Sequence, residues 1–217
     1  IMKTSLSLVD LSFLKVESHD TPMHVASLQI FQLPSDAQPG FVKSVVESYR
    51  SGPPKSSPWD LRLTQSLWSK VLPSLERTAD IDMNYHVRHT CLPYPGGERE
   101  LGELISHLHG QQLDRSRPLW TCHVIEGLEN NRFAIYTKIH HALMDGILGL
   151  HFTARCLSKD PNGKTSAPWH WASASSQKRG STASTPNANK VQASVDRLKW
   201  LSHVPNMLSP NWRRKGV

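Results

Sequence analysis

The sequence is poor in cysteine and lacks a long apolar run. No stretch of about 18 consecutive apolar residues occurs, so no membrane-spanning helix is predicted. The opening IMKTSLSLVD lacks the apolar core of a secretory signal peptide. The 3 cysteines, Cys91, Cys122 and Cys156, are odd in number and show no CxxC spacing. This pattern argues against a disulfide framework and a zinc site, and it predicts a protein of the reducing cytoplasm.

Acidic residues are scarce in the last third of the chain, and this part accounts for all of the positive net charge of the protein. The formal net charge is +7. Up to residue 150 there are 14 Lys and Arg against 16 Asp and Glu, whereas from residue 151 onward there are 11 against 2. The near-neutral first part argues against a nucleic-acid-binding domain. A basic end section suits an anionic membrane surface, a nucleic acid or acidic groups of its own protein.

The spacing of apolar residues predicts a mixed α/β architecture. Alternation and β-branched content predict strands at Met23–Leu33, Trp120–Glu126 and Arg132–His140. The last two are expected to form an antiparallel hairpin. Apolar residues at i, i+3, i+4 and i+7 predict helices at Phe41–Arg50 and Leu101–Gly110, and apolar residues spaced 3, 4 and 3 positions apart predict one at Ile147–Leu157.

The composition changes after residue 157. Residues 158–189 are rich in Ser, Ala, Pro, Thr and Asn, which predicts a flexible linker. Residues 190–217 combine Lys and Arg with apolar side chains and predict a basic amphipathic segment, with a helix at Val191–Leu201.

The stretch KIHHALMDGIL, residues 138–148, carries two adjacent histidines at the end of a predicted strand. Successive side chains of a strand point to opposite faces. His141 shares its parity with Phe133, Ile135 and Ile139, the more apolar set, so it is predicted to point inward and His140 the other way. Opposite orientations argue against a metal site shared by the two rings.

The residue types in this stretch suit proton transfer. A buried neutral imidazole with a pKa near neutrality can accept a proton and return it. Asp145 could cap the following helix, pair with an arginine or orient His141. Gly146 would permit a tight turn. The residues alone leave open whether the histidine pair is catalytic or structural.

Four separated stretches resemble one enzyme family. They are HHALMDG, LSLVDLSFLKVES with DTPMHVASLQIF, DMNYHVRHTCLPYPGGERELGELI, and the Pro118-Leu119-Trp120 triplet. HHALMDG matches the HHxxxDG pattern of acyltransferases similar to chloramphenicol acetyltransferase, a pattern that nonribosomal peptide condensation domains share. The other three, in this order, resemble the bacterial wax ester synthase/diacylglycerol acyltransferase family. The resemblance extends from about residue 4 to residue 157.

The resemblance implies a reaction and a set of roles. A fatty acyl group would move from acyl-CoA, the co-substrate, to a long-chain alcohol or diacylglycerol, without a cofactor or metal. His141 would be the general base, His140 structural or orienting, and Asp145 architectural. Pro118, Leu119 and Trp120 would shape the acyl-binding region, although a core role for Trp120 is an equal alternative. Because no acyl-enzyme is needed, Cys122 and Cys156 are expected to be packing residues.

The resemblance also implies a larger assembly. Residues 1–157 would form the N-terminal half of a chloramphenicol-acetyltransferase-like enzyme with two pseudo-symmetric domains. The C-terminal domain, absent from this chain, would complete the site, from the same enzyme or as a second chain. Residues 190–217 would either dock on a lipid surface or cross over and pack on that domain. The expected location is cytoplasmic, peripheral on the inner membrane or on lipid droplets.

Two alternatives remain at this stage. The first is a condensation-like enzyme that forms amide bonds, since it shares HHxxxDG. The second is a non-catalytic lipid-binding half-domain, although the intact His141 and Asp145 argue against it.

Overall fold

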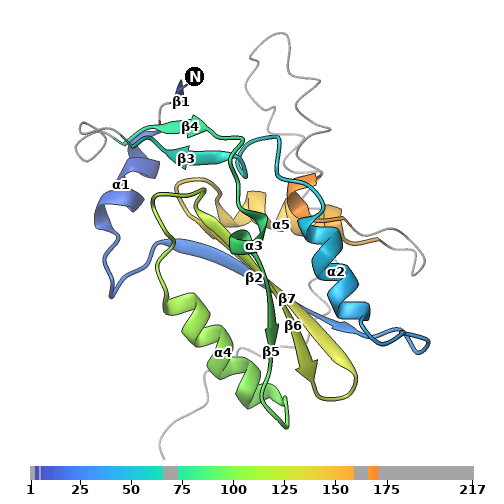
Figure 1. Ribbon diagram of the computed structural model, residues 1–217. Coiled ribbons are helices and arrows are strands. Elements are labelled where there is room, and N and C mark those ends of the chain that lie inside the picture. Colours follow the sequence, from blue (N-terminus) through green and yellow to red (C-terminus); the bar gives the residue numbers. More distant parts are fainter. Residues whose placement is uncertain (1–2, 5, 66–72, 159–165, 171–217) are drawn as a thin grey trace, which may run out of the picture. The chain divides into compact units, whose positions relative to one another are not determined.

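The computed structural model describes residues 3–4, 6–65, 73–158 and 166–170 (Figure 1). Within these ranges the main sheet contains β2 (His24–Gln32), β5 (Val87–Cys91), β6 (Trp120–Leu128) and β7 (Arg132–His140). The strand order is β2-β7-β6-β5, with β5 parallel to β6 and the other pairs antiparallel. The predicted strands and their hairpin are confirmed. Asn130 and Asn131 form its turn with positive φ angles, which asparagine tolerates better than most residues.

Helices cover both faces of this sheet (Figure 1). On one face lie α2 (Phe41–Arg50) and α5 (Gly146–Cys156), whose apolar residues share a core cluster with Phe133, Ile135 and Ile139 of β7. On the other face, α4 (Glu98–Gly110) packs Leu101 and Leu108 in a cluster with Ala134 and Tyr136. The three predicted helices are therefore confirmed. Strands β6 and β7 are buried on both faces along most of their length.

A smaller sheet borders the end of β7. Its strands β1 (Lys3–Thr4), β4 (Leu75–Arg77) and β3 (Leu61–Leu63) follow the order β1-β4-β3. Helix α1 (Leu8–Val16) contributes the buried Leu14 to the apolar cluster of this region, together with Leu119. Ser7 and Asp10 form a capping box that starts α1. The short helix α3 (Met83–His86) is capped by Asp82 and leads directly into β5.

An aromatic cluster joins distant parts of the chain. The fully buried Trp120 ring stacks on His86 with centroids 4.3 Å apart, and its Nε1–H donates to the Trp59 carbonyl oxygen at 2.8 Å. Trp169 lies 4.7 Å from Trp120, ring centre to ring centre, and is also fully buried.

The buried Trp169 corrects the predicted linker. Ala167 and Trp169 belong to the main core, so residues 166–170 are part of the folded unit and not of a flexible connection. The linker was predicted from the polar composition of residues 158–189 as a whole, whereas one large aromatic side chain is enough to anchor a short segment. The predicted segment 190–217, with its helix at Val191–Leu201, lies outside the described residues.

No helix in the described part of the chain is both long and apolar enough to cross a membrane.

Four of the described histidines are buried, His140 among them, and they predict a pH-dependent stability. His24, His86 and His123 are buried, and burial lowers the pKa of each to about 4. The unfolded chain binds these protons near pH 6.5, whereas the folded protein does not. Stability should therefore fall as the pH drops from 6.5 toward 4, by roughly 1.4 kcal/mol per pH unit for each histidine.

Urea unfolding at several pH values between 5 and 7.5 would measure this slope. His123→Gln should make it shallower by about the share of one histidine. His19→Gln, in which an exposed ring is replaced, should leave it unchanged. Equal slopes for wild type and His123→Gln would contradict the prediction.

Candidate active site

The two histidines at the end of β7 occupy different environments. His140, the last residue of the strand, is 0% exposed, whereas His141 is half-buried. The sequence predicted that His141 points inward and His140 the other way. This prediction is wrong, because His140 is the more deeply buried of the two. Both faces of β7 are covered, so alternation does not separate an inside from an outside. The strand also ends at His140, and the alternation does not extend to His141.

His140 is held from several sides. Its backbone N–H donates to the Leu119 carbonyl at 2.9 Å, and its own carbonyl accepts from Leu143 at 2.9 Å. The ring Nδ1 accepts the Ala142 backbone N–H at 3.0 Å, so Nδ1 carries no proton. Nε2 lies 3.5 Å from the Glu17 carboxylate. Burial lowers the pKa of His140 more than Glu17 raises it, so the ring is neutral at pH 7.

His141 keeps its ring nitrogens available. Its backbone N–H donates to the Met23 carbonyl at 3.0 Å, which ties the residue to the start of β2. Its ring stacks on Phe13 of α1, with centroids 4.0 Å apart and planes at 27°. In the part of the chain that the structure describes, no group hydrogen-bonds to its ring nitrogens. Of the pair, His141 is therefore the one suited to exchange a proton with a substrate.

Asp145 has an architectural place. Its exposed side chain accepts the Leu148 backbone N–H at 2.7 Å and caps the N-terminus of α5. Of the three roles weighed from sequence, capping is the one that its contacts show. Among the described residues it has no ion pair with an arginine and no contact with His141.

Gly146 is the first residue of α5, and its φ is not in the left-handed region, so the tight turn that it would permit does not lie at this residue. The turn occurs earlier, where Leu143 N–H donates to the His140 carbonyl. A Cβ added at Gly146 would meet no atom within 4 Å. Gly146 instead lines a cavity beneath α5.

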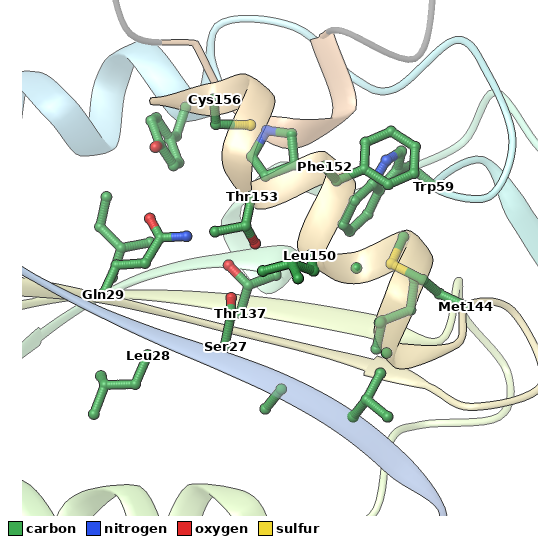
Figure 2. A pocket seen from close by; sticks show the side chains of 18 residues that line it. Ser27, Leu28, Gln29, Trp59, Thr137, Met144, Leu150, Phe152, Thr153 and Cys156 are labelled. Atoms are coloured by element: carbon green, nitrogen blue, oxygen red, sulfur yellow. The ribbon is translucent and has the colours of Figure 1, made fainter. Parts of the chain in front are cut away.

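An apolar cavity of about 360 Å³ lies between α5 and the strands β2 and β7 (Figure 2). Ser27 and Thr137 are cross-strand partners on its floor, and both point toward α5. Lining side chains from the α5 region include Met144, Leu150, Phe152 and Thr153. A volume of this order with a mostly apolar wall and a few polar groups is typical of a small-molecule site.

The cavity was not predicted, although two small residues in the strands could have indicated it. Ser27 and Thr137 are small residues in strands whose other side chains on this face are larger, and small facing pairs leave space above a sheet. His141 does not line the cavity. Ile139 and Met144, on either side of the histidine in the chain, do.

The Pro118-Leu119-Trp120 triplet does not line the cavity. Leu119 and Trp120 are fully buried, Leu119 in the cluster beside α1 and Trp120 in the aromatic cluster. Pro118 forms an isolated bridge with Arg62. The expected role of the triplet in shaping the acyl-binding region therefore stays a prediction, while Trp120 has the core position that was its alternative. Leu119 does contribute to the site, because its carbonyl accepts the His140 N–H.

Two of the three cysteines, Cys122 and Cys156, are poorly suited to be nucleophiles. Burial raises the pKa of Cys122 to about 12 and that of Cys156 to about 11. Both are therefore protonated thiols at neutral pH, and a thiol is a far weaker nucleophile than a thiolate. This agrees with the packing role expected from sequence.

The chain is similar to known acyltransferases. A family model described as the wax ester synthase/diacylglycerol acyltransferase catalytic domain matches residues 6–210. The O-acyltransferase WSD of Acinetobacter baylyi is 36% identical over 188 residues, which are 86% of this chain and 40% of that protein. A Mycobacterium tuberculosis protein named as a diacylglycerol O-acyltransferase is 42% identical over 165 residues, 76% of this chain and 37% of that protein.

Solved structures show the same relationship. The wax ester synthase/diacylglycerol acyltransferase from Marinobacter aquaeolei matches with a TM-score of 0.71 and 31% identity, covering 90% of this chain and 45% of that one. The starter condensation domain of rhizomide synthetase matches with a TM-score of 0.50 at 12% identity, a likeness of fold alone. The predicted mixed α/β acyltransferase fold is thus confirmed. The chain spans half or less of the length of each of these proteins.

The capping contact of Asp145 predicts a stability effect that separates it from a catalytic one. Asp145→Ala should lower the free energy of unfolding by about 1 kcal/mol, because the first turn of α5 loses its acceptor. Asp145→Asn should retain most of that stability, since asparagine is also a good N-cap. Urea unfolding of the three proteins would measure the differences. If Asn costs as much as Ala, the carboxylate charge has a partner beyond the cap.

Proposed function

The chain belongs to the wax ester synthase/diacylglycerol acyltransferase family, and we propose that it forms the histidine-bearing half of an O-acyltransferase. The complete enzyme would move a fatty acyl group from acyl-CoA to the hydroxyl of a long-chain alcohol or of diacylglycerol. The products would be a wax ester or triacylglycerol, together with free CoA.

One observation supports His141 as the base more than any other. Of the adjacent histidines, His140 is fully buried and uses its Nδ1 for the Ala142 N–H, whereas His141 is half-buried and, among the described residues, its ring is held by stacking and not by a hydrogen bond. A general base must come within hydrogen-bond distance of the proton that it removes. His141 can meet that condition, and His140 cannot without leaving its place.

The reaction then balances with one imidazole. His141 takes the proton of the acceptor hydroxyl as that oxygen attacks the thioester carbonyl carbon. A carbon–oxygen bond forms and the carbon–sulfur bond breaks. The imidazolium returns the proton to the departing CoA thiolate, so no covalent acyl-enzyme is required. The protonated thiols of Cys122 and Cys156 are consistent with such a direct transfer.

The cavity beneath α5 is proposed to hold an alkyl chain of one substrate. Its wall is mainly apolar, and Met144 and Gly146 connect it to the loop that follows His141. Fatty acyl and fatty alcohol chains offer the apolar surface that such a wall would remove from water.

A C-terminal half, in the same protein or as a second chain, is proposed to cover the site. Apolar side chains stand exposed on two helices near the histidines, among them Leu8 of α1 at 86% and Ile147 of α5 at 74%. Exposed apolar surface of this kind is typical of an interface. Docking on the inner membrane or on lipid droplets remains a proposal that rests on the basic composition of residues 190–217.

Replacement of His141 tests the proposed base. In the full-length gene product, His141→Ala should lower the rate of CoA release from palmitoyl-CoA with hexadecanol or a diacylglycerol by about 10²–10⁴-fold, the usual worth of a general base. His151→Ala, in an exposed histidine of α5, is the matched control and should keep full activity. Thermal unfolding of His151→Ala should match wild type, and His141→Ala should lose only about 1 kcal/mol, because it gives up the ring stack on Phe13 but not a fully buried side chain.

The same assay separates the alternatives. Transfer to amines but not to alcohols would favour the condensation-like enzyme. Binding of a fluorescent fatty acid without CoA release from any acceptor would favour the non-catalytic lipid-binding protein. Full activity of His141→Ala would remove this residue from the mechanism.

Filling the cavity should change the preferred chain length. Thr153→Phe places a large ring opposite Ser27 and Thr137, so turnover of long-chain substrates should fall while short-chain substrates are kept. His151→Phe adds a similar ring on the exposed side of α5 and should not change the preference. The measurement is kcat/KM across a series of acyl-CoA and alcohol chain lengths. An equal loss at every length would show that the cavity holds no substrate chain.

A further inference from the structure

Helix α1 and the residue that ends it contact both histidines of the pair. Within Leu8–Val16 only Leu14 is buried, and Leu8, Val9 and Val16 are exposed. The helix is therefore not placed by a broad apolar face. Two side chains one turn apart, Phe13 in the helix and Glu17 at its C-terminal end, instead contact His141 and His140 respectively.

Glu17 is a buried carboxylate that reaches both histidines. Its side chain is 1% exposed, and Oε2 lies 3.5 Å from the His140 Nε2. Oε1 accepts the Met23 backbone N–H at 3.1 Å, and the Met23 carbonyl in turn accepts the His141 N–H at 3.0 Å. Glu17 thus contacts the His140 ring directly and the His141 backbone through one residue.

Arg115 keeps this carboxylate charged. Its Nη2 donates to Glu17 at 2.8 Å and also to the Leu14 carbonyl at 2.8 Å. Burial alone would raise the pKa of Glu17, but the hydrogen bonds from Arg115 and Met23 and the nearby His140 outweigh it and lower the pKa. A charged oxygen beside Nε2 favours a proton on that nitrogen. The Ala142 N–H, donating to Nδ1, requires the same tautomer.

Phe13 acts on the other ring. Stacking at 4.0 Å with planes at 27° restricts rotation of the His141 imidazole, while leaving its edge and both nitrogens uncovered by Phe13. A catalytic imidazole has to present one nitrogen to the reacting hydroxyl in a defined direction, because misplacement by about 1 Å can cost 10²-fold in rate.

We propose that Phe13 and Glu17 are positioning residues, an inference that rests on the proposed function. Glu17 fixes the tautomer of His140 and the backbone position of His141. Phe13 fixes the plane of the His141 ring. We call this pair the α1 clamp. The clamp acts through the two histidines and does not itself touch substrate.

Glu17→Gln tests the first half of the α1 clamp. The change keeps the shape but removes the charge beside Nε2. In the full-length gene product, kcat should fall about 10- to 100-fold with KM little changed, because the substrate site remains while the base is misplaced. Histidine-selective ¹⁵N NMR should show that His140 loses its fixed pattern of a protonated Nε2 and an unprotonated Nδ1. Glu103→Gln, in an exposed ion pair of α4, is the matched control and should change neither.

Phe13→Leu and Phe13→Tyr test the second half. Leucine keeps apolar contact but has no ring, so kcat should fall and the His141 ring protons should lose the shift that a stacked aromatic ring produces. Tyrosine keeps the ring and should retain both the rate and the shift. Phe13 is half-buried, so these variants remain informative even if Glu17→Gln fails to fold.

The outcomes separate the clamp from the proposed function. Wild-type transfer that survives both Glu17→Gln and Phe13→Leu, with unchanged histidine signals, overturns the clamp and leaves the acyltransferase in place. If wild type transfers no acyl group, the proposed function fails, and the NMR signals alone decide the clamp. Unchanged tautomer and ring shifts in the variants would then overturn it.

Discussion

Strand β7 pairs with β2 along one edge and with β6 along the other, and helices cover both of its faces. A strand enclosed on every side can hold its last residue in place but cannot offer it to a substrate. The chain therefore has to turn at His140 before a side chain becomes accessible. The hydrogen bond from the Leu143 N–H to the His140 carbonyl closes that turn. It leaves His140 fully buried and His141 half-buried near the protein surface. The division of roles between the two rings follows from where β7 ends.

Local patterns predicted the elements whose signals lie within a few residues. The β6–β7 hairpin and the helices α2, α4 and α5 carry clear alternation or helical spacing, and all were predicted. The parallel pairing of β5 with β6 was not, because it joins Val87 to Cys122 through a long connection. Helix α1 was missed because its exposed apolar residues hide any amphipathic pattern, although the Ser7–Asp10 capping box could have revealed its start. Trp169 was missed because its partners are far away in sequence.

Two separate arguments favoured His141 in the sequence, and the structure removes the basis of one of them. The parity of the strand selected His141 as the buried ring, and the family resemblance selected His141 as the base. The structure leaves His141 half-buried, and this suits a base better than full burial would, since the hydroxyl of a lipid has to reach it. Parity failed because it assumes one solvated face, a condition that a doubly covered strand does not meet. The contacts from α1 lie more than 120 residues earlier in the chain and leave no local signal.

Asp145 and Gly146 of the motif lie where α5 begins, and the position of α5 explains what they contribute. Asp145 determines where the helix begins, and α5 forms one wall of the cavity through Gly149, Leu150 and Thr153. Gly146 lies in the first turn with no atom within 4 Å of an added Cβ, so the wall is open at this end. Phe152 packs on Trp59 with ring centres 5.8 Å apart, which attaches the helix to the aromatic cluster around Trp120. The cap at one end and this aromatic contact further along therefore hold α5 above the gap that Ser27 and Thr137 leave in the sheet. By this route the buried Trp120 supports the cavity without lining it.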